Sequence, residues 1–247
     1  STKVGKQLYE IAAKKFIKIV LELGGSAPGI VFDDVDVEQF AESIYFWRFS
    51  NCGQSCDALK RLLVHENVAT ELIDQLKTII AQKKVGDPTS KSTDVGSLAA
   101  KRQIDLLKSQ VKDALDKGAQ VIIGGNVIES NFYELTLLQN VNQNMRVWQE
   151  EVFGPVLPII TFKTEEEAIQ LANDTSFGLG AYLFTKDTQR IDRVVSKLES
   201  GMVSVNGVNY VIPHNPFGGY KQSGLGRAHG KYGLHELSQI KLIAKPK

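Results

Sequence analysis

The clearest candidate for a chemically active group is the thiol of Cys56, which ends segment 51–56, Asn-Cys-Gly-Gln-Ser-Cys. This segment follows a helix-like stretch, contains a turn glycine and leads into an apolar strand, so it can carry the thiol to a cleft. A thiolate is a strong nucleophile, but an ordinary cysteine is mostly protonated at neutral pH and needs activation. By itself, the segment is equally compatible with a buried structural cysteine.

Three further segments combine residue types that could bind or activate a ligand. Glu22 stands near the end of the apolar run 19–23, which is predicted to be a buried strand and is followed by two glycines. Ligands gather at the carboxyl ends of strands in open α/β sheets, and a partly buried carboxylate there would have a raised pKa and suit general base catalysis. Segment 150–155, Glu-Glu-Val-Phe-Gly-Pro, places two acids beside an aromatic residue and a turn. Segment 216–227, Pro-Phe-Gly-Gly-Tyr-Lys-Gln-Ser-Gly-Leu-Gly-Arg, allows close approach of the backbone. Taken singly, each is a weak signal, and an ordinary solvated turn or edge carboxylate explains it better.

Together, these segments resemble the aldehyde dehydrogenase superfamily in their order and spacing. Leu-Glu-Leu-Gly-Gly at 21–25 resembles the family motif with the general base, and 51–56 resembles the motif Asn-x-Gly-Gln-x-Cys with the nucleophile. Segments 150–155 and 216–227 resemble two further family motifs. The resemblance covers essentially the whole chain. It implies an α/β catalytic domain with a largely parallel sheet and flanking helices.

The resemblance implies a mechanism in which Cys56 is the nucleophile and Glu22 the general base. Thiolate attack on an aldehyde would give a thiohemiacetal, hydride loss to NAD or NADP a thioester, and water activated by Glu22 a carboxylic acid. The backbone N–H of Cys56 would help to hold the oxyanion. The resemblance assigns cofactor binding to Ser1 near the pyrophosphate, Leu23 and Gly24 beside the nicotinamide, Glu151 on the nicotinamide-side ribose and Phe153 in the nicotinamide region.

Smaller details bear on the substrate and on other chemistries. Segments 24–28 and 60–61 most resemble bacterial succinate-semialdehyde dehydrogenases, which implies a short aliphatic aldehyde with a distal carboxylate. Glu22 favours hydrolysis to an acid, because relatives that pass the acyl group to coenzyme A tend to lack this base. Cys52 is interpreted as a bystander. The four histidines lack metal-ligand spacing and the family uses no metal, so no metal site is predicted.

The elements that must position these residues alternate between helices and strands. Helices are expected at 5–18, 37–49, 72–80, 104–115 and 191–198 and after the capping box at 164–167, and strands at 19–23, 30–32, 62–65, 121–123, 182–185 and 202–205. This alternation predicts an α/β fold with a largely parallel sheet. The apolar tail 239–244 is a strand candidate. It matches a family strand that joins a neighbouring subunit, which implies a homodimer or homotetramer.

By the same resemblance the chain divides into three parts. Residues 1–24 are a remnant of an N-terminal dinucleotide-binding domain that is otherwise mostly absent. Residues 25–230 are the catalytic domain, and residues 231–247 are a C-terminal segment with the oligomerisation strand. Because most of the cofactor domain is absent, the chain alone is expected to be inactive. Two other hypotheses are a cofactor-independent thiol esterase and a non-catalytic assembly module.

The composition is that of an ordinary globular protein, with 43% hydrophobic and 23% charged residues. The formal net charge of +1 gives no reason to expect a nucleic-acid partner. The sequence has no apolar run long enough for a membrane span, and no signal peptide is expected. Two cysteines in 247 residues make no disulfide framework and fit a reducing compartment, which predicts the cytoplasm.

Overall fold

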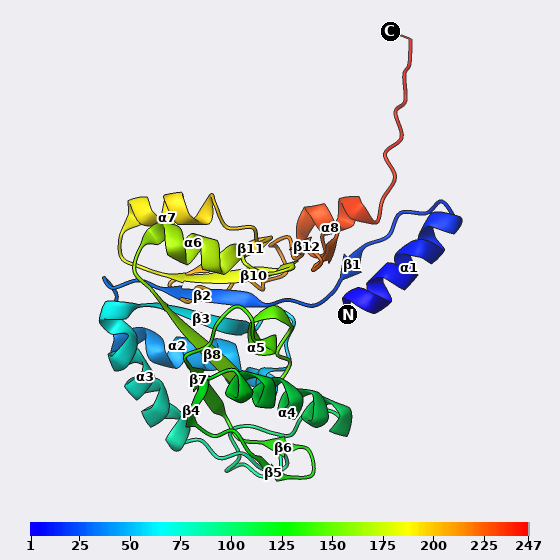
Figure 1. Cartoon of the computed structure of the whole chain (residues 1–247). Coiled ribbons are helices and arrows are strands. Elements are labelled where there is room, and N and C mark those ends of the chain that lie inside the picture. The colour runs from blue at the N-terminus through cyan, green and yellow to red at the C-terminus, as the bar shows by residue number, and fades with distance from the viewer. Residues whose placement is uncertain (247) are drawn as a thin grey trace.

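The computed structural model describes residues 1–246 and has helices on both faces of one large sheet (Figure 1). The helices are α1 (Thr2–Lys14), α2 (Val37–Phe49), the 3-10 turn η1 (Ser50–Gly53), α3 (Glu66–Ala81), α4 (Lys101–Asp116), α5 (Arg146–Gln149), α6 (Glu165–Asn173), α7 (Thr188–Val195) and α8 (Gly230–Glu236). The strands are β1 (Leu21–Glu22), β2 (Ala27–Val31), β3 (Leu59–His65), β4 (Gln120–Ile123), β5 (Val127–Glu129), β6 (Phe132–Tyr133), β7 (Thr136–Gln139), β8 (Val156–Phe162), β9 (Phe177–Gly178), β10 (Gly180–Phe184), β11 (Met202–Val205), β12 (Tyr220–Lys221) and β13 (Gly224–Leu225).

The large sheet has the strand order β11-β10-β2-β3-β8-β7-β4, and every neighbouring pair is parallel except β7 with β4. This confirms the prediction of an α/β fold with a largely parallel sheet. Helices α6 and α7 cover one face and α2 and α3 the other (Figure 1). Because both faces are covered, β2 is buried along its whole length and β3 is buried up to its last residue.

Two adjacent cations in β3 are fully buried, and they point to opposite faces of the sheet because successive strand residues alternate. The Arg61 guanidinium donates to the carbonyl groups of Ser26 at 3.1 Å, Leu171 at 2.9 Å and Ala172 at 2.8 Å. It therefore ties β3 to the segment before β2 and to the end of α6. Lys60 points to the other face.

The predicted strand 19–23 is the largest departure from expectation. In the described chain only Leu21 and Glu22 form β1, which pairs antiparallel with β13 outside the large sheet. The apolar run was interpreted as buried, but only Leu21 in it is buried. The helix predicted at 5–18 spans Thr2–Lys14 instead, and Phe16 just after it has a left-handed φ of 53° that no α-helix accommodates.

The C-terminal tail has no regular secondary structure over residues 238–246, and residue 247 lies outside the described part of the chain. Ile240 and Leu242 are 94% and 92% exposed. A strand needs a partner for its backbone groups, and the partner predicted for 239–244 belongs to another subunit. The strand therefore stays a prediction, as do the domain boundaries at 24 and 230.

The parallel strands bring their amino ends to one edge of the sheet, and the candidate site gathers there. Gly25 lies just before β2, Cys56 before β3 and Phe153 before β8. The sequence had placed Glu22 at the carboxyl end of a strand, where ligands collect in open α/β sheets. That placement was wrong, because β1 is not a strand of the large sheet.

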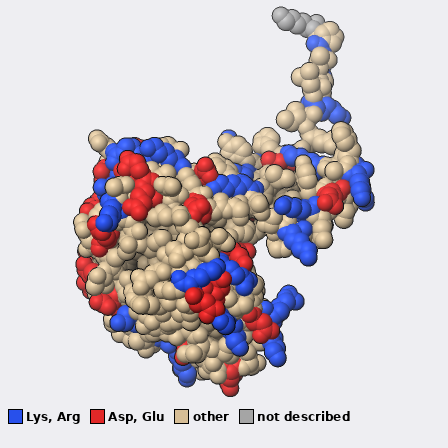
Figure 2. All heavy atoms as spheres, in the orientation of Figure 1, with Lys and Arg blue, Asp and Glu red and all other residues tan. Residues whose placement is uncertain are grey.

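The surface carries both signs of charge. Figure 2 shows basic and acidic side chains interspersed over the face in view, in keeping with the formal net charge of +1. None of the helices within residues 1–246 combines the length and the apolar character that crossing a bilayer requires. The same residues contain no group of three or more His, Cys, Asp or Glu side chains that could hold a metal ion.

Candidate active site

The turn that carries Cys56 has an uncommon backbone. Asn51, Cys52 and Gly53 all lie in the left-handed region, with φ of 53°, 57° and 69°. That conformation costs a non-glycine residue about 1–2 kcal/mol. Asn51 Nδ2 donates to the Gln54 carbonyl at 3.0 Å, and Gln54 Nε2 donates back to the Asn51 carbonyl at 3.2 Å. The amide side chains of segment 51–56 thus hold the turn that presents the thiol.

Three successive carbonyl groups around the thiol are bound by interior side chains. Lys60 Nζ donates to the carbonyl oxygens of Ser55 at 2.7 Å and Cys56 at 2.8 Å. Tyr182 Oη donates to the carbonyl oxygen of Asp57 at 2.9 Å. Within residues 1–246, the backbone N–H of Cys56 donates no hydrogen bond. The carbonyl groups are used inside the protein, and this N–H remains for a ligand.

Burial raises the pKa of the half-buried Cys56 thiol above its ordinary value. The negative charges of Asp57, Glu151 and Glu22 raise this pKa further, whereas the positive charge of Lys60 lowers it. A thiolate at this position therefore depends on the Lys60 ammonium group for compensating charge.

Cys52 differs from Cys56 although both are free thiols. Its side chain is 2% exposed, and burial raises its pKa to about 12 against the opposing charge of Arg48. A thiol that is both buried and protonated is unreactive.

Glu22 lies on β1, whose partner β13 belongs to the glycine-rich segment 216–227. A Cβ at position 218 would lie 3.1 Å from Glu22 Oε1, so Gly218 leaves room for the carboxyl group. Partial burial of this carboxyl raises the pKa of Glu22 to about 7 against the opposing charge of Arg227, although the residue as a whole is exposed. A carboxyl with a pKa near neutrality suits a general base.

Glu151 is held by two donors at one carboxylate oxygen. Its Oε1 accepts from the Gly25 N–H at 3.1 Å and pairs with Lys60 Nζ at 3.1 Å. A Cβ at position 24 would lie 2.5 Å from Oε2, so a side chain there would displace the Glu151 carboxylate from this position. The ring centroid of Phe153 lies 5.7 Å from Lys60 Nζ. One buried ammonium group therefore contacts both the 150–155 loop and segment 51–57, called the nucleophile turn after the role expected of Cys56.

A second buried cation fastens this loop from the opposite side. Arg48, at the end of α2, donates through Nη2 to the carbonyl of Val152 at 3.2 Å and to the carbonyl of Gly154. It links the helix that leads into the nucleophile turn to the 150–155 loop.

All the residues that the sequence assigns to the site line one cavity of about 500 Å³. They are Cys56, Glu22, Ser1, Leu23, Gly24, Glu151 and Phe153, and the wall is completed by Gln103, Leu106, Gln110 and Glu150. The structure therefore brings together residues as far apart in the chain as Ser1 and Phe153.

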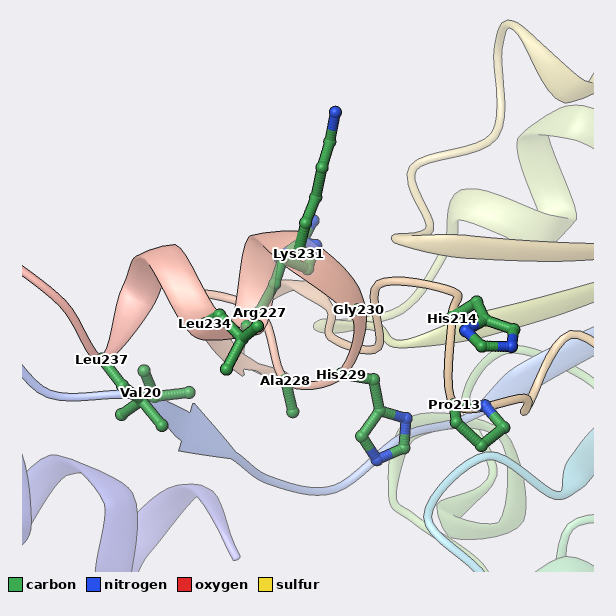
Figure 3. A pocket seen from close by; sticks show the side chains of 11 residues that line it. Val20, Pro213, His214, Arg227, Ala228, His229, Gly230, Lys231, Leu234 and Leu237 are labelled. Carbon is green, nitrogen blue, oxygen red and sulfur yellow. The ribbon is translucent and has the colours of Figure 1, made fainter.

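A larger cavity of about 740 Å³ lies elsewhere, and none of the predicted site residues lines it. Figure 3 shows Val20, Leu234 of α8, Leu237 just after that helix, and His214 and His229 around it. The side chains in its wall include no thiol and no carboxylate. It therefore lacks the combination of a thiol and carboxylates that lines the 500 Å³ cavity.

Sequence reasoning did not assign Lys60 or Arg48 to the site, although both left a signal. Lys60 interrupts the apolar run 58–64, and a cation in a strand covered on both faces must find partners. Arg48 follows Ile44 at helical spacing on the apolar face of the predicted helix 37–49.

The chain matches the aldehyde dehydrogenase family model over residues 1–243 and belongs to that family, which confirms the resemblance. The mitochondrial succinate-semialdehyde dehydrogenase of Arabidopsis thaliana is 43% identical over 245 residues, 98% of this chain and 46% of the relative. The succinate-semialdehyde dehydrogenase [NADP(+)] of Escherichia coli is 40% identical over 245 residues, 98% of this chain and 51% of the relative. The crystal structure of a Staphylococcus aureus betaine aldehyde dehydrogenase in complex with NAD+ matches at a TM-score of 0.91 and 36% identity, over 96% of this chain and 48% of that one. The chain thus spans about half the length of these relatives.

We expect Gly25→Ala to distort the nucleophile turn. A Cβ there would collide with the carbonyl oxygen of Cys56 and approach the Leu179 Cβ to 3.1 Å. Overpacking of this kind lowers the free energy of unfolding by about 1–3 kcal/mol, which urea unfolding measures. In the control Gly96→Ala, the nearest atom to the new Cβ is Pro88 Cβ at 3.5 Å, an ordinary contact. Equal stability of the two variants would contradict the role of Gly25.

The raised pKa of Glu22 predicts a pH-dependent stability. Between its ordinary value of 4.5 and about 7, the folded chain keeps a proton at Glu22 that the unfolded chain has released. The contribution of Glu22 to stability therefore falls as pH rises through this window. Glu22→Gln, which cannot ionise, should gain stability relative to the unsubstituted protein from about pH 5 to about pH 8 in urea unfolding. The exposed control Glu71→Gln should not, and a flat difference for Glu22→Gln would refute the assignment.

Proposed function

We propose that an enzyme containing this chain oxidises an aldehyde to a carboxylic acid with NAD or NADP, using Cys56 as the nucleophile and Glu22 as the base. The observation that carries this proposal is one cavity shared by the thiol, a carboxyl group with a pKa of about 7 and the carboxylate of Glu151. Membership of the aldehyde dehydrogenase family supports the same reaction.

The chain's own groups can perform the covalent steps. The Cys56 thiolate attacks the aldehyde carbon, and the oxyanion of the thiohemiacetal accepts a hydrogen bond from the free backbone N–H of Cys56. A bound nicotinamide would accept the hydride, which leaves a thioester on the sulfur. Glu22 then takes a proton from water, whose oxygen adds to the thioester carbon as the thiolate leaves. The pKa of about 7 lets Glu22 accept this proton near neutral pH.

The residues present fit a dinucleotide on one side of the thiol. Within residues 1–246, Glu151 Oε2 accepts no hydrogen bond, so it is available to a ribose hydroxyl. Ser1 precedes the first turn of α1, where backbone N–H groups favour a phosphate. These features support cofactor binding by Ser1, Leu23, Gly24, Glu151 and Phe153. The proposal covers both NAD and NADP.

The proposal extends to the whole enzyme, because the chain spans about half the length of its relatives. We expect the 247-residue chain alone to oxidise aldehydes negligibly, and activity tests therefore use a full-length enzyme that carries it. The exposed apolar tail 239–244 supports a homodimer or homotetramer, and the two free thiols support the cytoplasm as its location.

Cys56→Ala in the full-length enzyme should reduce aldehyde-dependent cofactor reduction by about 10⁴-fold or more, since loss of a nucleophile removes the covalent route. Absorbance of the reduced nicotinamide measures this rate. The matched control Cys52→Ala should remain close to the unsubstituted enzyme, because Cys52 is buried. Substantial activity in Cys56→Ala would refute the nucleophile assignment.

For the substrate we propose a short aliphatic aldehyde such as succinate semialdehyde, supported by segments 24–28 and 60–61 and by the relatives named for it. A neutral aldehyde of the same length is a second candidate, which the charge of Asp57 favours. Asp57 follows the nucleophile directly, its carboxylate accepts from the Ser55 hydroxyl, and its negative charge acts on the thiol. A distal substrate carboxylate would meet the same repulsion.

Asp57→Asn should therefore lower the KM for succinate semialdehyde relative to the KM for butanal. We expect a change of about 3- to 10-fold, the size of one partly screened charge contact. Steady-state kinetics of the full-length enzyme measure both constants. Asp192→Asn on α7 is the control and should alter neither ratio nor rate. An unchanged ratio in Asp57→Asn would remove the argument for the neutral aldehyde.

A further inference from the structure

The side chain of Lys60 has no exposed surface, and every N–H group of its ammonium has an acceptor. Its three N–H groups have three acceptors: the carbonyl oxygens of Ser55 at 2.7 Å and Cys56 at 2.8 Å, and Glu151 Oε1 at 3.1 Å. Two of these acceptors flank the thiol and the third belongs to the cavity's cofactor side. Burying an ammonium group costs free energy, and a neutral side chain at this position would avoid that cost. The three acceptors compensate for it by hydrogen bonding to the charged group.

The charges that face the thiol come from several elements. Asp57 in the turn, Glu151 before β8 and Glu22 on β1 are acids, whereas Lys60 on β3 is a cation. The phenol of Tyr182 donates to the Asp57 carbonyl oxygen and accepts from Tyr210 Oη. The second buried cation, Arg48, faces Cys52 and Glu151. Among these groups, Lys60 is the one that opposes the acids at Cys56.

The ion pair between Lys60 and Glu151 gives the two carboxylate oxygens of Glu151 different roles. Oε1 is fixed by Lys60 and the Gly25 N–H, whereas Oε2 faces Gly24 and accepts no hydrogen bond within the described chain. One oxygen thus orients the group, and the other is left for a ligand hydroxyl.

We propose that Lys60 is a positioning residue that ties the nucleophile turn to the Glu151 carboxylate and supplies the positive charge that favours the Cys56 thiolate. The proposal rests on the assignment of Cys56 and Glu151 to an aldehyde dehydrogenase site. It adds an electrostatic link between the nucleophile and the cofactor side of the cavity, carried by one side chain.

The rate of Cys56 alkylation by iodoacetamide against pH tests the charge in the 247-residue chain. Fragment-ion mass spectrometry separates Cys56 from Cys52. Lys60→Met and Lys60→Gln should each move the midpoint up by about one pH unit and lower the rate at pH 8 by about 3- to 10-fold. The rate falls because less of the thiol is ionised at pH 8, and the higher nucleophilicity of the more basic thiolate offsets part of this loss. Lys60→Arg, which keeps the charge, should retain the original midpoint. The exposed control Lys112→Met should change nothing.

An unshifted midpoint in Lys60→Gln would overturn the proposal, since its amide keeps a donor without a charge. Fast labelling of Cys52 would reveal unfolding. If both neutral variants unfold, the Lys60→Arg profile decides, and a midpoint one unit higher in that variant overturns the charge role. This assay uses neither aldehyde nor dinucleotide, so its result is independent of the proposed oxidation.

In the full-length enzyme, Lys60→Gln should raise the KM for NAD+ or NADP+ with little change in the KM for the aldehyde. A proportional rise in both constants would overturn the orienting role toward Glu151.

Discussion

The site depends on the parallel pairing of β2, β3 and β8. Because these strands are neighbours and run in the same direction, the segments that lead into them emerge side by side at one edge of the sheet. Gly25, Cys56 and Glu151 lie in those segments, more than a hundred residues apart at the extremes. A register shift in any of these pairs would separate the thiol from the carboxylate without altering either residue.

Close approach of the backbone is the second requirement at this edge. A side chain at position 24 would meet the Glu151 carboxylate, and one at position 218 would crowd Glu22. Both glycines lie where two segments distant in sequence come together. At position 24 the small size of glycine is what matters, whereas Gly218 also has a φ of 155°, which favours glycine whatever the space.

Much of the architecture could be predicted from the sequence, because local patterns of apolar and capping residues indicate the helices and strands. Periodic apolar residues located α2, and the capping box located α6, whose N-cap Thr164 accepts from the Glu167 N–H at 3.2 Å. The motifs located the thiol and the carboxylates of the candidate cavity, but not Gln103, Leu106 and Gln110 in its wall. The pairing of β1 with β13 was missed, because two residues carry no periodicity. The contacts of Lys60 were missed because Glu151, its acidic partner, follows 91 positions later and no local pattern records such a distance.

The nucleophile turn is fastened at three successive residues through main-chain oxygen atoms rather than side chains. Every amino acid supplies that oxygen. A substitution at Ser55 or Asp57 therefore leaves the acceptors for Lys60 and Tyr182 in place. The side chains beside the thiol can thus change without loss of the contacts that hold the Cys56 backbone in place.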